Sequence, residues 1–427
     1  MSGNRKLPGI LLLVLVIVGM LVINSCVEDP TLPVLTTGQA SEITVNSAII
    51  SGDVTDDGGA DVNARGICWG IASMPALDDE FKASGTGKGE FTCAIEGLTP
   101  NTQYYARAYA ENSVGIAYGN EVTFTTGTAA PTVTTGQVSG ITANSAVCGG
   151  TVTYNGGGII TEKGVCWSTT SDPDLQDSYT SNSTGTETFS STMTNLLPGT
   201  RYYVKAYVKN AGGIAYGEQI VFNTKLADNE GNLYGIVIIG TQTWMSENLR
   251  VTTFNDNSPI PNVTADDEWI ALTTPAYCWF NNDATYKNTF GALYNWYTVE
   301  TGKLCPSGWH VPTDAEYKTL EIQIGMPAEQ ADLWNWRGTD EGYKMKSTTS
   351  WNDGGNGSNS SGFNGLCGGY RFGGTGAFNA LGILTYWWSS EHNDEQAVYR
   401  RLDFDSSGVY RSVTLKKGGK YIRCVKD

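Results

Sequence analysis

The chain contains an internal repeat at a constant offset of 98 residues. Five short motifs recur at that spacing, and together they span a whole domain. Their first residues form the pairs Thr36 and Thr134, Asn46 and Asn144, Cys68 and Cys166, Tyr104 and Tyr202, and Ala117 and Ala215. Because a single offset holds for all five motifs, we expect residues 34–127 and 132–225 to be tandem copies of one domain. Tandem copies ahead of an unrelated C-terminal region are typical of a spacer that presents a binding domain.

Each copy has the sequence pattern of a small all-β domain. Apolar and polar residues alternate over short runs such as 48–54 and 104–110, and Gly, Asn, Asp or Pro bound these runs. About seven strands in a domain of this length predict an immunoglobulin-like sandwich. Residues 98–104 and 196–202 resemble the tyrosine corner of fibronectin type III domains, in which a tyrosine hydroxyl bonds back to the chain. We therefore expect two immunoglobulin- or fibronectin-III-like sandwiches that act as spacers.

The first residues of the chain predict export. Arg5 and Lys6 precede an apolar run over residues 10–23. This run is too short to cross a bilayer, which takes about 20 residues, but it suits the core of a signal peptide. The run ends in residues 23–26, Ile-Asn-Ser-Cys, which resemble a bacterial lipobox. An ordinary secretory signal is the alternative.

The lipobox resemblance implies cleavage before Cys26 and acylation of that residue as the new N-terminus. Residues 1–25 would then be a lipoprotein signal peptide, and residues 26–33 a lipidated tether. Several acyl chains hold a protein on a membrane durably, at roughly 0.8 kcal/mol per buried methylene. Glu28 and Asp29 follow the cysteine and resemble the export tag of surface lipoproteins. We therefore expect an outer-membrane protein that is anchored by lipid and exposed at the cell surface.

Disulfides are permissible in an exported chain, and eight cysteines follow Cys26. Each repeat holds two of them, in different arrangements. Cross-sheet bridges are one possibility for the repeats, and buried free thiols are the other. The candidate bridges are Cys68–Cys93 in the first repeat and Cys148–Cys166 in the second.

The C-terminal region differs in character from the repeats. Ten of the 12 tryptophans lie in residues 226–427, among Gly- and Asn-rich loops. Apolar runs on both sides of Gly240 predict a β-hairpin, and apolar residues at helical spacing predict a helix over residues 290–300. A capping box formed by Thr313 and Glu316 predicts a second helix. Further strands are expected at residues 368–373, 386–390, 397–404, 408–415 and 420–425.

A series of motifs in this region resembles the Fibrobacter succinogenes major paralogous domain. In chain order the motifs are residues 239–249, 277–283, 291–296, 304–316, 361–364, 368–371, 387–390 and 422–425. The resemblance covers nearly all of residues 229–427. It implies a location and an architecture rather than a reaction, because the activity of this family is unsettled. Cys367 departs from the family, which more often has proline at this position.

A looser resemblance concerns the fold of the same region. Residues 311–317, a Gly-rich stretch and the final Arg-Cys-Val resemble the C-type-lectin-like frame shared with formylglycine-generating enzymes. This resemblance implies an α+β domain in which two helices and a small sheet support long loops. It favours a Cys305–Cys424 disulfide, with Cys278–Cys367 completing the set, although sequence alone does not choose among the pairings. The whole chain is thus expected to hold two all-β sandwiches followed by an α+β C-type-lectin-like domain.

The residues argue against an enzyme. The chain has two histidines, His310 and His392, too few for a multi-histidine metal site, and a serine–histidine hydrolase is equally disfavoured. His310 lies beside a predicted helix start, where a structural role is expected. Formylglycine-generating enzymes use a close cysteine pair, whereas Cys367 and Cys424 are 57 residues apart. Paired carboxylates leave a hydrolase as the least favoured alternative.

Binding is the activity that the composition favours. Exposed aromatic rings stack on sugars and peptides, and one or two of five tryptophans near the loops are expected to be exposed. The five are Trp334, Trp336, Trp351, Trp387 and Trp388. Asn352 and Asp353 are weak calcium candidates, because Trp-Asn-Asp occurs in sugar-binding C-type lectins, though closer to the last cysteine than here. No other cofactor is expected.

These observations predict a lipid-anchored binding or adhesion protein of the cell surface. Two spacer domains would present the C-terminal region to an extracellular polysaccharide or glycoprotein. The alternative is a structural surface or fimbria-associated protein that contacts other proteins. Nucleic acid is an unfavourable partner, because 27 Lys and Arg against 43 Asp and Glu leave a net charge of −16.

Overall fold

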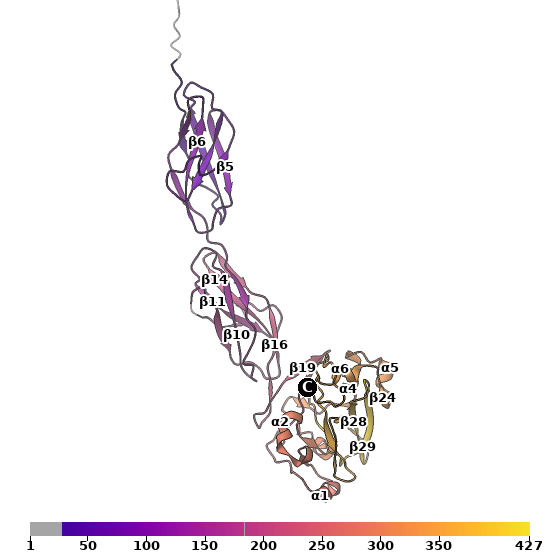
Figure 1. The fold of residues 1–427 in the computed structure, drawn as a ribbon. Helices are drawn as coiled ribbons and strands as arrows, with labels where there is room; N and C mark the ends of the chain where they lie inside the picture. The colour runs from indigo at the N-terminus through magenta and orange to yellow at the C-terminus, as the bar shows by residue number, and fades with distance from the viewer. Residues whose placement is uncertain (1–27, 183) are drawn as a thin grey trace, which may run out of the picture. The chain divides into compact units, whose positions relative to one another are not determined.

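The computed structural model describes residues 28–182 and 184–427. The signal peptide predicted over residues 1–25 and the lipidation site at Cys26 lie outside these residues. The chain divides into two compact units, one ending at Thr128 and one spanning Ala129–Asp427. Strands dominate both units, and the helices of the described residues all lie in the C-terminal region (Figure 1). None of these helices is long and apolar enough to span a membrane.

The first repeat is a sandwich of two antiparallel sheets. One sheet has the order β1 (Val34–Thr37), β2 (Ser47–Asp56) and β5 (Gly89–Glu96). The other has the order β4 (Glu80–Ala83), β3 (Ala64–Gly70), β6 (Gln103–Glu111) and β7 (Ile116–Tyr118), and β8 (Val122–Thr125) also pairs with β6. Every second residue of β5 is buried, as expected for a strand with one face on a core. A single buried cluster draws Ile50, Ile67 and Ile95 from both sheets.

The second repeat has the same strand order. One sheet contains β9 (Thr132–Thr135), β10 (Ala146–Tyr154) and β13 (Phe189–Met193). The other contains β12 (Ser178–Tyr179), β11 (Glu162–Ser168), β14 (Arg201–Asn210) and β15 (Gly213–Tyr216), with β16 (Ile220–Asn223) paired to β14. The predicted tyrosine corner is present in both copies. The Thr99 amide donates to the Tyr104 hydroxyl and the Leu197 amide to the Tyr202 hydroxyl, each at 3.0 Å.

The four cysteines of the repeats are free and buried, so the cross-sheet bridges are not formed. They are Cys68, Cys93, Cys148 and Cys166. In β3, Ile67 and Trp69 belong to the core cluster. Because side chains alternate along a strand, Cys68 between them points to the opposite face, where its Sγ lies 3.2 Å from the Pro75 carbonyl oxygen. Cys166 has the same place in β11, and neither thiol faces its expected partner.

The C-terminal region contains several small sheets, short helices and one larger sheet. The small sheets are formed by β17 (Leu226–Ala227) with β18 (Leu233–Tyr234), by β21 (Tyr277–Cys278) with β22 (Leu293–Tyr294), and by β19 (Ile236–Ile239), β20 (Gln242–Met245), β30 (Val425–Lys426) and β23 (Trp309–His310) in that order. The larger sheet has the order β24 (Asn335–Arg337), β29 (Val409–Leu415), β28 (Gln396–Asp403), β27 (Leu384–His392), β25 (Gly368–Arg371) and β26 (Phe378–Leu381). Only β25 and β27 are paired in parallel within it.

The helices of this region are short. They are α1 (Asp266–Ala271), α2 (Lys287–Phe290), α3 (Trp296–Glu300), α4 (Asp314–Gln323), α5 (Ala328–Ala331) and α6 (Glu341–Met345), with single 3-10 turns at Phe280–Asn282 and Ala284–Tyr286. The hairpin predicted around Gly240 is confirmed by β19 and β20. The capping box is confirmed too, because the Thr313 and Glu316 side chains cap α4 reciprocally.

The helix predicted over residues 290–300 is wrong. Gly291, with φ of 83°, ends α2, and the Asn295 side chain caps a separate helix by accepting from the Thr298 amide. The strand β22 lies between the two helices. Every residue from 290 to 296 is buried, so the spacing of apolar residues marked no single face. Of the predicted strands, that over residues 420–425 is reduced to bridges before β30, and the others are present.

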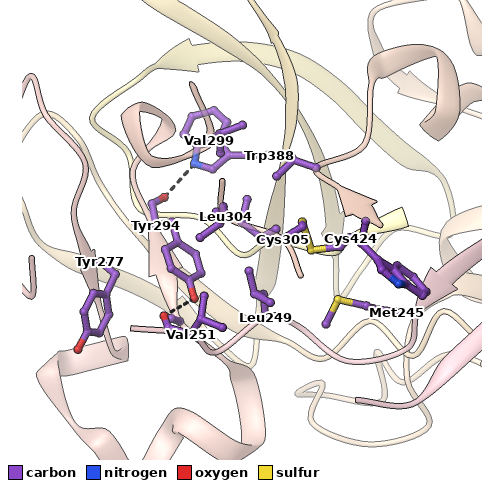
Figure 2. Packing of buried hydrophobic residues seen from close by; sticks show 14 of the residues in the cluster. Met245, Leu249, Val251, Tyr277, Tyr294, Val299, Leu304, Cys305, Trp388 and Cys424 are labelled. Carbon is purple, nitrogen blue, oxygen red and sulfur yellow. Dashed lines mark hydrogen bonds between the residues drawn. A yellow bond between two sulfur atoms is a disulfide. The ribbon is translucent and has the colours of Figure 1, made fainter. Parts of the chain in front are cut away.

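A disulfide joins Cys305 to Cys424 inside the hydrophobic core, as Figure 2 shows. The favoured pairing is therefore confirmed. The bridge expected between Cys278 and Cys367 is absent, because both residues are free and buried. Burial raises the pKa of the Cys278 thiol, and the nearby Arg371 guanidinium offsets part of that effect.

Candidate ligand-binding face

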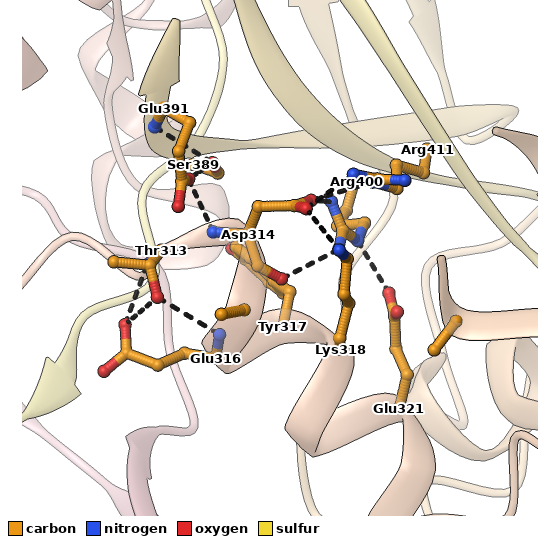
Figure 3. A network of polar contacts seen from close by, with 12 residues as sticks. Thr313, Asp314, Glu316, Tyr317, Lys318, Glu321, Ser389, Glu391, Arg400 and Arg411 are labelled. Carbon is orange, nitrogen blue, oxygen red and sulfur yellow. Dashed lines mark hydrogen bonds and ion pairs between the residues drawn. The ribbon is translucent and has the colours of Figure 1, made fainter. Parts of the chain in front are cut away.

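Neighbouring residues of a strand point to opposite sides of the large sheet. The side chains on its two faces differ in chemistry. On one face a network of ion pairs joins α4 to the sheet (Figure 3). Arg400 of β28 contacts Asp314 at 2.8 Å and Glu321 at 2.7 Å, and Arg411 of β29 contacts Asp314 at 2.6 Å. Arg337 of β24 completes the network on Glu321 at 2.7 Å.

This network is buried, and it closes its face of the sheet. Burial raises the pKa of the Asp314 carboxyl, but the Arg411 and Arg400 guanidinium groups more than offset that effect and hold the pKa well below its usual range. The carboxylate is thus charged at neutral pH and fully paired. The Asp314 and Glu321 carboxylates are each paired with two arginines, so this face presents no unpaired carboxylate to a ligand, although Arg337 Nε is buried without a partner among the described residues. A ligand is therefore expected on the other face of the sheet.

The other face carries one aromatic or cationic side chain from each of five adjacent strands. We call this set the aromatic row, and it consists of Trp336 on β24, Tyr410 on β29, Arg401 on β28, Tyr386 on β27 and Tyr370 on β25. The strand register places Trp336 opposite Tyr410, Tyr410 opposite Arg401, and Arg401 opposite Tyr386. Tyr370 follows by ring contact with Tyr386, the centroids being 4.8 Å apart.

The members of the row pack edge to face and around one cation. The rings of Trp336 and Tyr410 lie 5.2 Å apart at an angle of 67°. The Arg401 guanidinium lies 4.8 Å from the centre of Tyr410 and 5.3 Å from that of Trp336, within reach of cation–π attraction. Its charge is balanced by Asp403 on the same strand, with which it forms a bidentate pair. The row is therefore an ordered surface with rings, hydroxyls and one fixed ion pair.

The row is open to solvent at its β24 end, and the sheet face beside it along β27 is covered. Trp388, next to Tyr386 on the same face of β27, is sealed by the preceding chain, because its indole N–H donates to the Tyr294 carbonyl at 2.9 Å (Figure 2). At the β24 end of the row Trp336 keeps 41% of its surface exposed, and Asn335 beside it is exposed too. Tyr410 donates from its hydroxyl to Asn335 Oδ1 at 3.0 Å. The open end thus offers an aromatic ring next to polar groups.

Lys420 lies beneath the row in a cage of four rings. Its Nζ is 4.0 Å from the centre of Tyr386, 4.8 Å from Trp388 and 4.9 Å from Tyr399, with Tyr370 at 5.6 Å. The residue is 3% exposed, and its Nζ makes no hydrogen bond or ion pair with any described residue. Burial lowers the pKa of this amine, and Arg401 adds to the effect, so that the pKa is about 7.

Of the five tryptophans predicted as ligand-binding candidates, two are exposed and three are buried. Trp336 belongs to the aromatic row. Trp334, 49% exposed, lies on the opposite side of the sheet edge, with its ring 3.9 Å from the Arg411 guanidinium of the ion network. Trp351, Trp387 and Trp388 are buried, and the indole N–H of each bonds to a buried acceptor. Those three rings are core residues and offer no surface for stacking.

The weak calcium candidates are not gathered into a coordination site. Asn352 and Asp353 are exposed in a turn, and Asp353 has φ of 50°. Among residues 28–182 and 184–427, no group of three or more His, Cys, Asp or Glu side chains is placed to hold a metal ion. His310 has a structural environment, in which it bridges Asp427 at 2.6 Å and Glu316 at 2.8 Å. Burial lowers its pKa, but the two carboxylates outweigh burial and raise the pKa above its ordinary value.

The described chain is thus a mostly β, multidomain protein with an aromatic sheet face in its C-terminal region. Residues 237–426 of that region match the model of the Fibrobacter succinogenes major domain family, as the motifs in the sequence predicted. No curated protein matches the chain.

Two solved structures show a limited likeness. The sensor domain of the anti-sigma factor RsgI4 of Pseudobacteroides cellulosolvens is 24% identical, with a TM-score of 0.19, over 23% of this chain and 96% of that chain. The FN1–FN3 domains of chicken CNTN1 are 16% identical, with a TM-score of 0.22, over 46% of this chain and 69% of that chain. At these TM-scores neither likeness supports a conclusion about fold or function.

The sequence identified one member of the row, Trp336, and missed the others. Strands were expected at 397–404 and 408–415, and Tyr399, Arg401 and Tyr410 lie on them. The sequence therefore indicated which residues of each strand share a face of the sheet. The order of the strands was not, and without it a tyrosine on one strand could not be placed beside a tyrosine on another.

Proposed function

We propose that the chain is a lipid-anchored cell-surface protein whose C-terminal region binds an extracellular glycan through the aromatic row. The observation that carries this proposal is the alignment of four rings and one arginine across five strands, open to solvent at Trp336. Sugars present an apolar ring face and hydroxyl edges, and an aromatic ring flanked by hydrogen-bonding groups matches both. The two repeats serve as spacers in this proposal, and Cys26 as the anchor.

Trp336 would stack on the sugar ring. Asn335 and the Tyr410 hydroxyl lie beside it and would bond to sugar hydroxyls. The pair of Arg401 and Asp403 would fix the rings before a ligand arrives, so that little side-chain freedom is lost on binding. Nothing in this arrangement needs a metal ion, and catalysis is not part of the proposal.

The test is binding of the full chain to a panel of soluble and insoluble polysaccharides, with calcium and then with EDTA. Trp336→Ala should weaken binding about tenfold, the effect of losing roughly 1.4 kcal/mol of stacking. Trp334→Ala is the matched control, because it removes a similarly exposed indole two residues away on the opposite side of the sheet edge. Equal loss in both variants, or no loss in Trp336→Ala, would contradict the proposal. No binding to any polysaccharide would favour the alternative of a protein partner and an assembly role, and loss of binding in EDTA would reinstate calcium.

A further inference from the structure

The repeats carry a second kind of surface feature, a cleft that recurs at the 98-residue offset. In the first repeat a cleft of about 810 Å³ lies at the open edge of the sandwich, between the ends of β3, β4 and β5. In the second repeat a cleft of about 600 Å³ occupies the same place. Every residue that lines the second cleft is the counterpart of a residue that lines the first. The cleft is thus a property of the domain and not of one loop.

A tryptophan forms the floor of each cleft and keeps an unused hydrogen-bond donor. Trp69 is 8% exposed and Trp167 is 9% exposed. No described residue accepts a hydrogen bond from either indole N–H, and neither nitrogen is sealed from solvent. The deeper tryptophans differ, since Trp387 and Trp388 both have protein acceptors. Trp69 and Trp167 line their clefts and solvent reaches both N–H groups, so each donor is available to an acceptor that enters the cleft.

The rims of the two clefts differ in charge. Both clefts have the aspartate that is Asp79 in the first repeat and Asp177 in the second. Each carboxylate accepts a hydrogen bond from the backbone N–H three residues earlier in the chain, so it stabilises the fold. The first cleft has three further carboxylates, and none of them has a hydrogen bond or ion pair with a described residue. They are Asp78, Glu80 and Glu96, and their counterparts are Gln176, Ser178 and Thr194.

Two apolar side chains complete the first cleft. Ile71 is 72% exposed and Phe81 is 51% exposed, and both line it. The cleft therefore offers an indole donor, unpaired negative charge and exposed apolar surface together. A neutral saccharide would leave the three negative charges uncompensated, and a metal ion would leave the donor and the apolar rim unused.

We propose that the cleft of the first repeat binds an extended lysine- or arginine-containing segment of a partner protein. A carbonyl oxygen of the segment would accept from the Trp69 indole. Its cationic side chains would pair with Asp78, Glu80 and Glu96, and its apolar atoms would lie against Ile71 and Phe81. The second repeat has the donor and the cleft but lacks the three carboxylates, so it would not select a basic segment. This binding is independent of the aromatic row.

The test measures binding of a fluorescent, capped peptide of four Gly-Lys units to the full chain by anisotropy, with a Gly-Glu peptide as the reference. The triple change Asp78→Asn, Glu80→Gln and Glu96→Gln should weaken lysine-peptide binding roughly tenfold, from the loss of three exposed ion pairs. A control triple, Glu42→Gln, Glu90→Gln and Glu111→Gln, removes the same charge from exposed positions outside the cleft. It should change the Kd less than about twofold.

Trp69→Phe keeps the ring and removes the donor, and it should weaken binding about fivefold. Trp167→Phe, the matched change in the second repeat, should leave binding unchanged, and thermal melting of both variants reports any loss of folding. Equal weakening by the two triples would show attraction to net charge alone and would overturn the proposal. Equal binding of the lysine and glutamate peptides, absence of lysine-peptide binding, or equal effects of the two tryptophan changes would overturn it as well.

Discussion

The caged amine of Lys420 predicts that the stability of the C-terminal region rises with pH. In the folded state the pKa is about 7, whereas a lysine in an unfolded chain has a pKa of about 10.4. Between these values the unfolded chain binds the proton and the folded chain does not. Stability therefore increases with pH over this range. The slope is about 1.4 kcal/mol for each pH unit, and the full range corresponds to about 5 kcal/mol.

The phenols that surround Lys420 do not titrate in the interval from pH 7.5 to 9.5 used for this measurement. Burial raises the pKa of Tyr386 and of Tyr399 above 10, so both phenols stay neutral. Arg423, whose pKa burial lowers to about 9, also titrates near the upper end. Its contribution is the same in a protein changed only at Lys420, and it cancels in the difference between the two proteins.

This prediction is tested by urea unfolding at several pH values. The unfolding is monitored by tryptophan fluorescence, to which the ten tryptophans of the C-terminal region contribute. The unchanged chain should gain about 2–3 kcal/mol between pH 7.5 and 9.5 relative to Lys420→Met. Methionine keeps most of the apolar stem against the four rings, and at pH 7.5 the variant should be the more stable protein. Lys303→Met, which removes an exposed lysine, should leave the pH dependence intact. Parallel profiles for the unchanged chain and Lys420→Met would refute the reasoning.

Three further perturbations have expected outcomes. Glu321→Gln removes the negative charge that the buried Arg337 and Arg400 share. It should lower the free energy of unfolding of the C-terminal region in urea by about 3–5 kcal/mol. A decrease below about 1 kcal/mol would contradict the proposed role of the ion-pair network. Thr313→Ala removes half of the capping box and should cost about 1 kcal/mol by the same assay, whereas Thr319→Ala on the exposed side of α4 serves as the control. Reduction of the Cys305–Cys424 bridge, whose ends are 119 residues apart, should lower stability by about 4–5 kcal/mol; an unchanged melting temperature in reductant would count against it.

Local signals in the sequence predicted the elements whose partners lie close in the chain. The capping box at Thr313 needs only three residues to form, and the hairpin at Gly240 joins adjacent runs. The failed helix over residues 290–300 shows the limit of such signals. Buried on every side, that segment had no polar face to set a period, and Gly291 and Asn295 decided where helices end and begin.

The cysteines show the same limit for tertiary contacts. Cys68 lies on a correctly predicted strand, yet a disulfide depends on which face of the strand it occupies. Ile67 and Trp69 take the core face, so the thiol between them turns outward. Alternation along a strand with apolar residues on both sides of Cys68 is thus the local signal that argues against the bridge.

Comparison of the two repeats distinguishes residues that both copies share from residues that are present in one copy only. Trp69, Asp79 and Tyr104 recur as Trp167, Asp177 and Tyr202, with the same cleft and the same hydrogen bonds of the aspartate and the tyrosine. A change between copies that leaves strand order and register unaltered is therefore at a position that does not determine them. The three rim carboxylates of the first cleft are changes of this kind, since strand order and register are the same without them. The C-terminal region has no second copy to compare. There the comparison is between Trp334 and Trp336, which are similarly exposed on opposite sides of one sheet edge.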